Sequence, residues 1–476
     1  MTAFTIFWIT LPFFIGFIIY LFPRLARVLA ASIPVVSATY ALQLFLLDSP
    51  LKLQLLDNAG VSLLADSISG YFILTNALVT AAVIAYCWSK GKTAFFYTQM
   101  MMLHASVNAI FICNDLISVY VSLEVIGIAA FLLVAYPRTN RAIWVALRYL
   151  FVSNTAMLFY LVGAVLVYRY QHSFDFSALN QAPPEAIALL CLGLLAKGGI
   201  FISGLWLPLT HSESESPVSA LLSGVVVNTG VFPLLRFALT VETLDPIVRT
   251  FGLCTALFGV AYAVFEKDTK RMLAFSTISQ MGFVMAVPFA GGFYALAHGL
   301  AKSCLFLMSG VLPSRQFKDL EQTPIDRRLW GAIAIASLSI SGLPFIGGFA
   351  AKAYTMKNLN SWQEIAMNVA VVGTCCAFAK FLFIPFGDKQ ENLAVGFWLG
   401  VGSLIGGLLA ANGLYYDLYT PANVIKSLVT LALGWTAYWV FFRHTSIQLP
   451  RVLERFENLI GMMSLILIAL FWMVLA

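Results

Sequence analysis

Four ionisable side chains lie in the middle of long apolar stretches of the sequence. Glu124 lies within NDLISVYVSLEVIGIAAFLLVAY, and Lys197 lies within LLAKGGIFISGLWLP. Lys302 and Lys352 occupy similarly central positions further along the chain. A charge at the centre of a bilayer costs about 3 kcal/mol even on lenient scales, so such residues face a bundle interior, pair with each other or meet water. We therefore favour a functional role for all four.

An acid and an amine that meet away from water can exchange a proton. A buried carboxylate by itself holds its proton, whereas a lysine close by favours the anion. A buried lysine by itself tends to lose its proton and keeps it beside a carboxylate. A small change in the separation of Glu124 and Lys197 would therefore change which group is protonated. This is a physical basis for a pump or antiport step.

Two histidines extend this chemistry. His298 and Lys302 are four residues apart, which places both on one face of a helix. Histidine can carry a proton at physiological pH, so the pair could connect two half-sites, although a packed core histidine is the alternative. His211, in THSESESPVSALL, is a candidate for proton entry. Lys380 is a further amine inside an apolar stretch.

Three other basic residues, Arg148, Arg236 and Lys426, lie nearer to the ends of apolar stretches. Long basic side chains can bury their stems and extend their charge to the membrane surface. For these three residues such snorkelling is an open alternative to a role in the interior.

The composition indicates which solvent surrounds these residues. The chain has 476 residues, of which 60% are hydrophobic and 11% charged, and a mean hydropathy of +0.87. Soluble domains carry about 25% charged residues, so lipid is the expected solvent. We read the net charge of +6 as basic cytoplasmic loops and expect no nucleic-acid partner. The seven cysteines form no CxxC pair or Cys/His cluster, so we expect no metal and no cofactor.

A membrane-spanning helix needs about 20 apolar residues. That length predicts an all-α, polytopic bundle of about 14–16 helices, the first of them retained rather than cleaved as a signal peptide. The candidate spans lie near residues 3–22, 28–47, 67–88, 93–113, 115–136, 143–168, 185–207, 217–240, 246–264, 270–288, 291–312, 329–356, 364–386, 393–416, 421–442 and 457–475.

The loops predict an orientation. If odd-numbered loops face the cytoplasm, they contain most loop lysines and arginines, and the other side keeps only Lys52, Arg169, Arg249 and Lys357. Basic residues concentrate in cytoplasmic loops. We therefore expect both termini on the non-cytoplasmic side of an inner (plasma) membrane, with a thylakoid membrane as the alternative.

Two predicted spans are interrupted by Gly and Pro. They are LLAKGGIFISGLWLPLTH and ISGLPFIGGFAAKAY, and each contains one lysine, Lys197 or Lys352. A pair of interrupted helices in corresponding halves points to an inverted-repeat transporter and its ion site. The alternative is a pair of ordinary kinked helices.

Together these segments resemble the antiporter-like membrane subunits shared by Mrp-type sodium/proton antiporters and respiratory complex I. The matching stretches run in the family's order over roughly residues 55–385, and the D-type member of Mrp antiporters looks most similar. The most specific stretch is KRMLAFSTISQMG; the others are NDLISVYVSLEVIG, LLAKGGIFISGLWLPLTHSESESPVSALLSG, HGLAKSCLFLMSG and SGLPFIGGFAAK.

The resemblance implies fourteen core helices, two inverted five-helix repeats and proton conduction along a hydrophilic axis in mid-membrane. Glu124 would be the carboxylate of the fifth helix and Lys197 the lysine of the broken seventh. Lys302, with His298, would be the relay of the eleventh helix, and Lys352 the lysine of the broken twelfth. The implied divisions are N-terminal helices (1–92), a first repeat (93–240), a second repeat (246–386) and C-terminal helices (390–476).

One position departs from the family's pattern. The family commonly has a lysine in the eighth helix, where this sequence reads VVVNTGVFPLLR and places Asn228. Asparagine can orient water but cannot carry a proton. The link between Lys197 and Lys302 must then pass through water, through His298, or not exist. From about residue 390 onward we see no family motif.

Three functions remain open. The first is a proton-translocating subunit of a multisubunit sodium/proton antiporter. The second is a proton-pumping membrane subunit of a complex I-like quinone oxidoreductase, in which a partner performs the redox chemistry. The third is a non-conducting scaffold or energy-coupling partner. A transporter subunit is favoured over an enzyme, and the expected partners are the lipid bilayer, other membrane subunits, protons and sodium.

Overall fold

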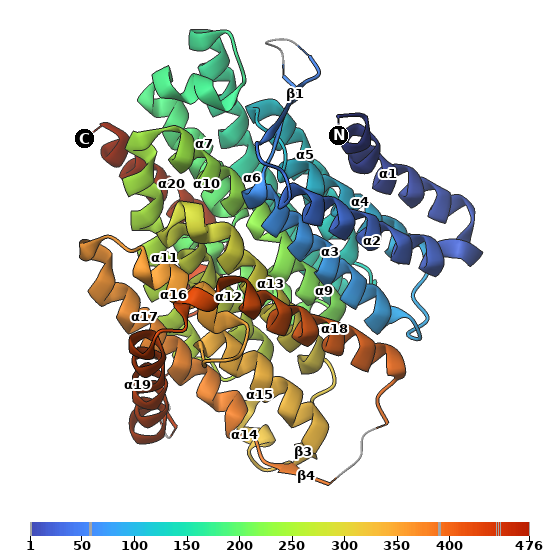
Figure 1. Cartoon of the computed structure of the whole chain (residues 1–476), viewed down its shortest axis with the longest axis vertical. Helices are drawn as coiled ribbons and strands as arrows, with labels where there is room; N and C mark the ends of the chain where they lie inside the picture. The colour runs from blue at the N-terminus through green and yellow to red at the C-terminus, as the bar shows by residue number, and fades with distance from the viewer. Residues whose placement is uncertain are drawn as a thin grey trace.

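The computed structural model describes residues 2–56, 60–388, 392–443, 445, 447 and 449–475. Long helices lie side by side through most of the molecule (Figure 1). Helices satisfy their own backbone hydrogen bonds, which lipid cannot do for them. The helices are α1 Thr2–Leu21, α2 Ala26–Leu44, α3 Ser67–Cys87, α4 Ala94–Ile110, α5 Leu116–Val134, α6 Asn140–Gln171, α7 Pro184–Lys197, α8 Trp206–Glu213, α9 Ser216–Leu221, α10 Asn228–Thr240, α11 Asp245–Phe265, α12 Thr269–Ala286, α13 Gly291–Ser309, α14 Phe317–Leu320, α15 Arg327–Ser341, α16 Gly348–Lys357, α17 Ser361–Leu382, α18 Val395–Asn412, α19 Pro421–Ala437 and α20 Phe456–Leu475.

Within the described residues, twelve helical segments are long and apolar enough to cross a membrane. The helices α12 and α13 form two further, antiparallel passes, because Thr269 N at the start of α12 donates to Arg315 O just after α13, over 2.8 Å. The helix α4 and the broken pair α15–α16 complete the alternation. Twelve and these four make the sixteen spans expected from the sequence, so the prediction of a polytopic all-α bundle is confirmed. The chain is a polytopic membrane protein.

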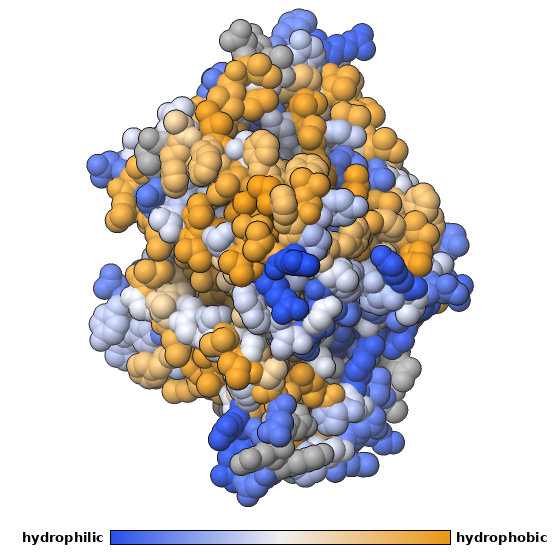
Figure 2. Space-filling model, turned by 90° about the vertical axis from the view of Figure 1, so that its right-hand side faces the viewer, coloured by the Kyte–Doolittle hydropathy of each residue, from blue (hydrophilic) through white to orange (hydrophobic). Residues whose placement is uncertain are grey.

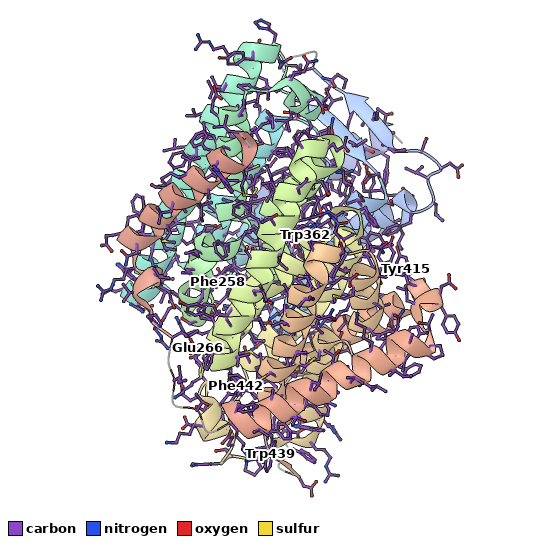
Figure 3. The ribbon with its side chains drawn as sticks, turned by 90° about the vertical axis from the view of Figure 1, so that its left-hand side faces the viewer. Phe258, Glu266, Trp362, Tyr415, Trp439 and Phe442 are labelled. Carbon is purple, nitrogen blue, oxygen red and sulfur yellow. The ribbon has the colours of Figure 1, made fainter. Side chains whose placement is uncertain are left out.

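The two ends of the bundle can be followed in Figure 3. Trp362 and Tyr415 lie towards one end of the oblique helices, and Glu266, Phe442 and Trp439 lie towards the other. We call these the Trp362 end and the Glu266 end. The alternation of the passes places the start of α1 at the Trp362 end.

Aspartates at the starts of helices fix where several spans begin. Asp66 accepts a hydrogen bond from Ser69 N at the start of α3, and Asp115 accepts one from Ser118 N at the start of α5. Asp268 does the same for Arg271 N in α12. An N-cap side chain satisfies an amide that the helix itself cannot, so polar residues mark the boundaries of otherwise apolar segments.

Both predicted interruptions are present. After α7 the chain passes through Gly199, with φ of +67°, into a short 3-10 helix, Phe201–Leu205, before α8 begins. A Cβ at Gly204 would lie 2.2 Å from Gly199 O, so this break requires glycine. Between α15 and α16, Gly342 has φ of +87°. Left-handed backbone of this kind favours glycine, so the Gly-rich sequences do produce two broken helices.

The sequence did not predict the short strands. β1 (Leu51–Gln54) and β2 (Ser62–Ala65) form an antiparallel hairpin in the loop before α3, and β3 (Ile325–Asp326) pairs in parallel with β4 (Phe386–Gly387). Strands of two to four residues show too little alternation to be recognised in a sequence. They close loops at the ends of the bundle and leave its architecture unchanged.

The outer surface agrees with a lipid environment. Figure 2 shows extensive hydrophobic surface on one side of the molecule, with hydrophilic residues gathered mainly towards its extremities. Large apolar side chains such as Phe14, Phe151 and Ile365 are exposed on the helices. Exposed apolar surface of this extent indicates contact with lipid or with other membrane proteins.

Candidate functional site

The amine of Lys197 lies next to the helix that carries Glu124. A Cβ atom placed on Gly127, one turn beyond Glu124 in α5, would lie 3.2 Å from Lys197 Nζ. The two charges interact electrostatically, although no direct ion pair joins them in the described part of the chain. Lys197 Nζ donates instead to Ser153 Oγ in α6, over 2.5 Å. The structure therefore places the predicted acid and amine together, with a hydroxyl beside the amine.

Aromatic and hydroxyl groups from α6 and α8 surround this pair. Tyr149 packs against Trp206 with ring centroids 5.1 Å apart, and its charge interaction with Glu124 shows that the two lie near each other. Trp206 Nε1 donates to Ala196 O, at the last turn before the break. The break thus leaves Lys197, which is 3% exposed, at the end of a helix and inside the bundle. Glu124 is only partly buried.

Asn228 lies where the next span changes its winding. A π-helical segment, Leu222–Val226, separates α9 from α10, and Asn228 Nδ2 donates to Gly224 O over 2.9 Å. The Oδ1 atom of Asn228 is buried without a hydrogen-bond partner among the described residues. A π segment often marks a functional site. Here it leaves a free acceptor between α7 and α13.

His298 and Lys302 both point into the core from α13, as predicted. Lys302 is fully buried, donates to Leu273 O over 2.8 Å, and lies 5.0 Å from the ring centroid of Phe378. His298 lies beside the backbone of Ser223, yet its ring nitrogens make no hydrogen bond to the described residues. Buried polar atoms normally have partners, so the free nitrogens indicate room for water.

His211 is more deeply placed than a residue of an open entrance. It is fully buried in α8 and stacks on Phe306 of α13, with centroids 4.7 Å apart. Its charge interaction with Lys302 shows that it lies on the same buried path. Both ring nitrogens again have no hydrogen-bond partner in the described structure. The structure therefore places His211 near Lys302 and away from bulk water.

A small cavity connects His298 to the second broken helix. Its volume is about 10 Å³, and it is lined by His298, Gln280, Ser339 and Ile340, among others. The Ser339 hydroxyl and Gln280 Nε2 have no partner among the described residues. One water molecule would fill such a space and could satisfy these atoms. Ile340, on the wall of this cavity, is also the residue whose carbonyl accepts the hydrogen bond of Lys352.

Lys352 ends this row of buried amines. Its Nζ donates to Ile340 O, over 2.7 Å, and lies 5.5 Å from the ring centroid of Phe283. The side chain crosses the break, because a Cβ on Gly342 would lie 3.0 Å from Lys352 Cδ. The carbonyl that it contacts comes from the last turn of α15, where the interrupted helix leaves acceptors unused.

Lys380 lies apart from the other amines. It donates to Ala263 O and Glu266 O and lines a cavity of about 490 Å³ at the Glu266 end. Burial raises the pKa of the Glu266 carboxyl, but the charge and hydrogen bonds of Arg271 outweigh it and hold that pKa below its ordinary value. Lys380 therefore belongs with a charged cluster near one membrane surface.

Sequence reasoning missed the uncharged members of the site. Ser153, Tyr149, Gln280 and Ser339 come from four different spans and were not singled out. The only signal available was a polar residue within an apolar stretch, which many structural residues share. Arg236 was left open as a snorkelling residue, and it instead forms two hydrogen bonds with the carboxylate of Asp66, both of 2.6 Å.

Comparison with known proteins places this architecture in a family. Residues 113–377, which are 265 of the 476, match the family described as NADH:quinone oxidoreductase/Mrp antiporter, TM. The chain belongs to this family. The matched segment contains Glu124, Lys197, Asn228, Lys302 and Lys352, and it ends before Lys380 and the C-terminal helices.

Curated relatives of this family member differ in name. Hydrogenase-4 component B of Escherichia coli (strain K12) is 29% identical over 64% of this chain, which spans about half (52%) of that relative. The D-type member of the Na(+)/H(+) antiporter of Alkalihalophilus pseudofirmus is 25% identical over 71% of this chain and 77% of its own. The N-type member of the NADH-quinone oxidoreductase of Desulforudis audaxviator is 27% identical, with coverages of 79% and 81%.

Two solved structures share the fold. A chain of the Mrp complex from Dietzia sp. DQ12-45-1b superposes with a TM-score of 0.77 at 22% identity, over 93% of this chain and 56% of that chain. A chain of the membrane-bound sulfane sulfur reductase, an archaeal respiratory membrane complex, gives 0.75 at 19% identity, over 90% and 99%. These likenesses establish the fold of the family member and no more.

Proposed function

We propose that the chain is a proton-translocating subunit of a multisubunit sodium/proton antiporter. The observation that carries this proposal is the buried row of amines, in which Lys197, Lys302 and Lys352 each donate to a lone oxygen inside the bundle. Buried lysines without a carboxylate partner are costly. A row of them, interspersed with unpaired polar atoms, is suited to passing protons through water.

In this proposal, protonation of Glu124 and Lys197 begins the transfer. When the Glu124 carboxylate is ionised it stabilises the ammonium form of Lys197, and when it is protonated that support is lost. Lys197 then releases its proton to water near Asn228, whose free Oδ1 can orient that water. His298 and Lys302 receive it, and the cavity beside Gln280 leads on to Lys352. We propose 93–240 and 246–386 as the two inverted repeats that carry these steps.

The exposure of Glu124 supports a partner subunit. Glu124 is partly exposed on α5 and lies on the same helical face as Val121 and Ile128, which are 54% and 52% exposed. A carboxylate on a lipid-facing surface in mid-membrane is costly. We therefore propose that another membrane subunit of the assembly covers this face and supplies a polar group to Glu124.

Relatives named as members of quinone oxidoreductases and as a hydrogenase component favour a second candidate. In it the same path is driven by redox chemistry in partner subunits. The proton path within this chain is common to both candidates. Dependence of transport on sodium or on an electron donor separates them. We propose an inner (plasma) membrane location with both termini on the non-cytoplasmic side.

The test is fluorescence-monitored proton movement in vesicles that contain the whole assembly. Wild type is compared with Glu124→Gln and Lys197→Ala, with and without sodium. We expect both variants to lose about a hundredfold or more in rate, the scale at which a positioned proton-transfer group contributes. Lys52→Gln, which removes an exposed loop charge, is the control. Unchanged transport in both variants would remove the proposal and leave a non-conducting scaffold.

A further inference from the structure

A cationic cavity lies beside the second broken helix, between α16, α17 and α19. Its volume is about 140 Å³. Three of its lining residues are lysines, half of the others have polar side chains, and none is an aspartate or glutamate. The lining residues are Ser341, Gly342, Phe349, Lys352, Ala353, Met356, Lys357, Asn368, Val371, Asn423, Lys426, Ser427 and Thr430.

Two of these lysines have no partner in the described structure. Lys357 and Lys426 are exposed, and neither side chain makes an ion pair or a hydrogen bond with the described residues. Glu364 in α17 and Asp417 in the 3-10 helix Gly413–Leu418 are the acids of neighbouring elements, and neither lines the cavity. The lysines therefore repel each other with no anion to offset them.

The spacing of polar residues in α19 builds one wall of this cavity. Asn423, Lys426, Ser427 and Thr430 follow the i, i+3, i+4, i+7 spacing that puts them on one face. Ser427 Oγ donates to Gly342 O at the break, which fixes α19 against α15. The opposite face of α19 is apolar and exposed, with Ile425 60% and Val429 52% exposed. The polar face thus turns to the cavity and the apolar face to lipid.

The depth of the cavity matches the boundary of the bilayer. Lys426 lies five residues after Pro421, the first residue of α19, and this is about 7.5 Å along a helix. Lys357 is the last residue of α16. Figure 3 shows α19 along the edge of the bundle, running from Trp439 towards the side of Tyr415. Both free amines therefore lie near the Trp362 end, within reach of lipid headgroups.

We propose that this cavity binds the phosphate group of an anionic phospholipid. Lysine ammonium groups bind phosphate as point charges, and basic pockets between membrane helices bind anionic headgroups. The hydroxyl of Thr430 and the amides of Asn368 and Asn423 supply further donors, and the apolar outer faces of α17 and α19 accommodate acyl chains. A free phosphate ion shares this chemistry, but it has no acyl chains to bury against Ile365 and Val429.

The inference goes beyond the proposed function, because binding can be measured without transport. The purified full chain in detergent is mixed with phosphatidylglycerol or phosphatidylcholine, and bound lipid is measured by native mass spectrometry. The double variant Lys357→Gln/Lys426→Gln is compared with Lys52→Gln, which removes a loop lysine from the same end of the bundle. Each lysine near the membrane surface contributes about fivefold in affinity, so we expect the double variant to bind phosphatidylglycerol about thirtyfold more weakly.

Several outcomes decide the matter. Selective retention of phosphatidylglycerol that is lost only in the double variant supports the proposal. Equal retention by the wild type and the double variant overturns it, as does equal retention of both lipids. Binding of inorganic phosphate without retention of phosphatidylglycerol also overturns it and assigns the cavity to a free anion. Thermal unfolding in phosphatidylcholine, expected to be unchanged, shows that the double variant is folded.

Discussion

The amine of Lys197 occupies the space that a side chain at Gly127 would need. A Cβ at Gly127 would lie 3.2 Å from Lys197 Nζ and 3.5 Å from Ser153 Oγ. Glycine at this position therefore lets the lysine approach α5 one turn from Glu124. The distance between the acid and the amine, on which the proposed transfer depends, is set partly by the absence of a methyl group.

The first prediction is that Gly127→Ala slows proton transport without unfolding the protein. The new methyl group makes contacts closer than most, so the amine must move by a few tenths of an ångström away from α5. We expect a loss of about tenfold in the vesicle assay, since small misplacements of reacting groups are costly. Gly331→Ala, where a Cβ meets nothing within 4 Å, is the control. Equal rates for the two variants would contradict the geometric role of Gly127.

The second prediction concerns Asn228. Its Oδ1 is buried without a described partner, and in our proposal it orients water between Lys197 and Lys302. Asn228→Leu keeps a similar volume and removes the acceptor, so we expect transport to fall about tenfold or more, in line with the loss of one positioned proton-transfer partner. The measurement is the same vesicle assay, with thermal stability as the check on folding. A rate that stays at the wild-type level would place the path elsewhere.

Charge in an apolar context predicted the principal residues of the site. Glu124, Lys197, Lys302 and Lys352 stand out in the sequence because a lone charge in an apolar span is costly, and the structure places all four in the bundle. The sequence could not show that Lys197 donates to Ser153 rather than pairing directly with Glu124. That choice depends on where α6 packs against α5 and α7, and helix spacing alone does not determine it.

Partners far apart in sequence were similarly out of reach. The charge of Arg236 near the end of a span suggested snorkelling, whereas the structure pairs it with Asp66, 170 residues earlier. The polar face of α19 could be read from its spacing, but its meaning required the position of α16 and the break at Gly342. The fold class and the number of spans needed only composition and length, whereas these contacts needed the packed structure.

The third prediction is that the pair Asp66–Arg236 makes stability depend on acid. Burial raises the pKa of the Asp66 carboxyl, but hydrogen bonds and charge from Arg236 lower it further, and the net pKa lies below its ordinary value. A lowered carboxyl pKa stabilises the fold above the ordinary value of about 3.9, and this contribution is lost as pH falls through the lowered value.

Asp66→Asn should therefore remove stability at neutral pH, by about 2 kcal/mol or more for a mostly buried pair. Thermal unfolding in detergent between pH 7 and acid measures it. The variant and the wild type should converge as the pH falls below the ordinary carboxyl range. A constant difference between them across the whole range would show that the ion pair is not its source.

The last prediction is that Glu454 holds the C-terminal helix in place. Arg271 at the start of α12 donates to both carboxylate oxygens of Glu454, over 3.1 and 2.5 Å, and both side chains are less than a tenth exposed. Glu454 lies two residues before α20, which packs against α7. Removing one partner leaves Arg271 with a buried and partly uncompensated charge, so Glu454→Gln should cost about 3 kcal/mol. The exposed pair Arg327–Asp388 provides the control, because Asp388→Asn should cost about 1 kcal/mol or less. Thermal unfolding of the two variants measures the difference, and equal losses would show that α20 is held by its apolar contacts alone.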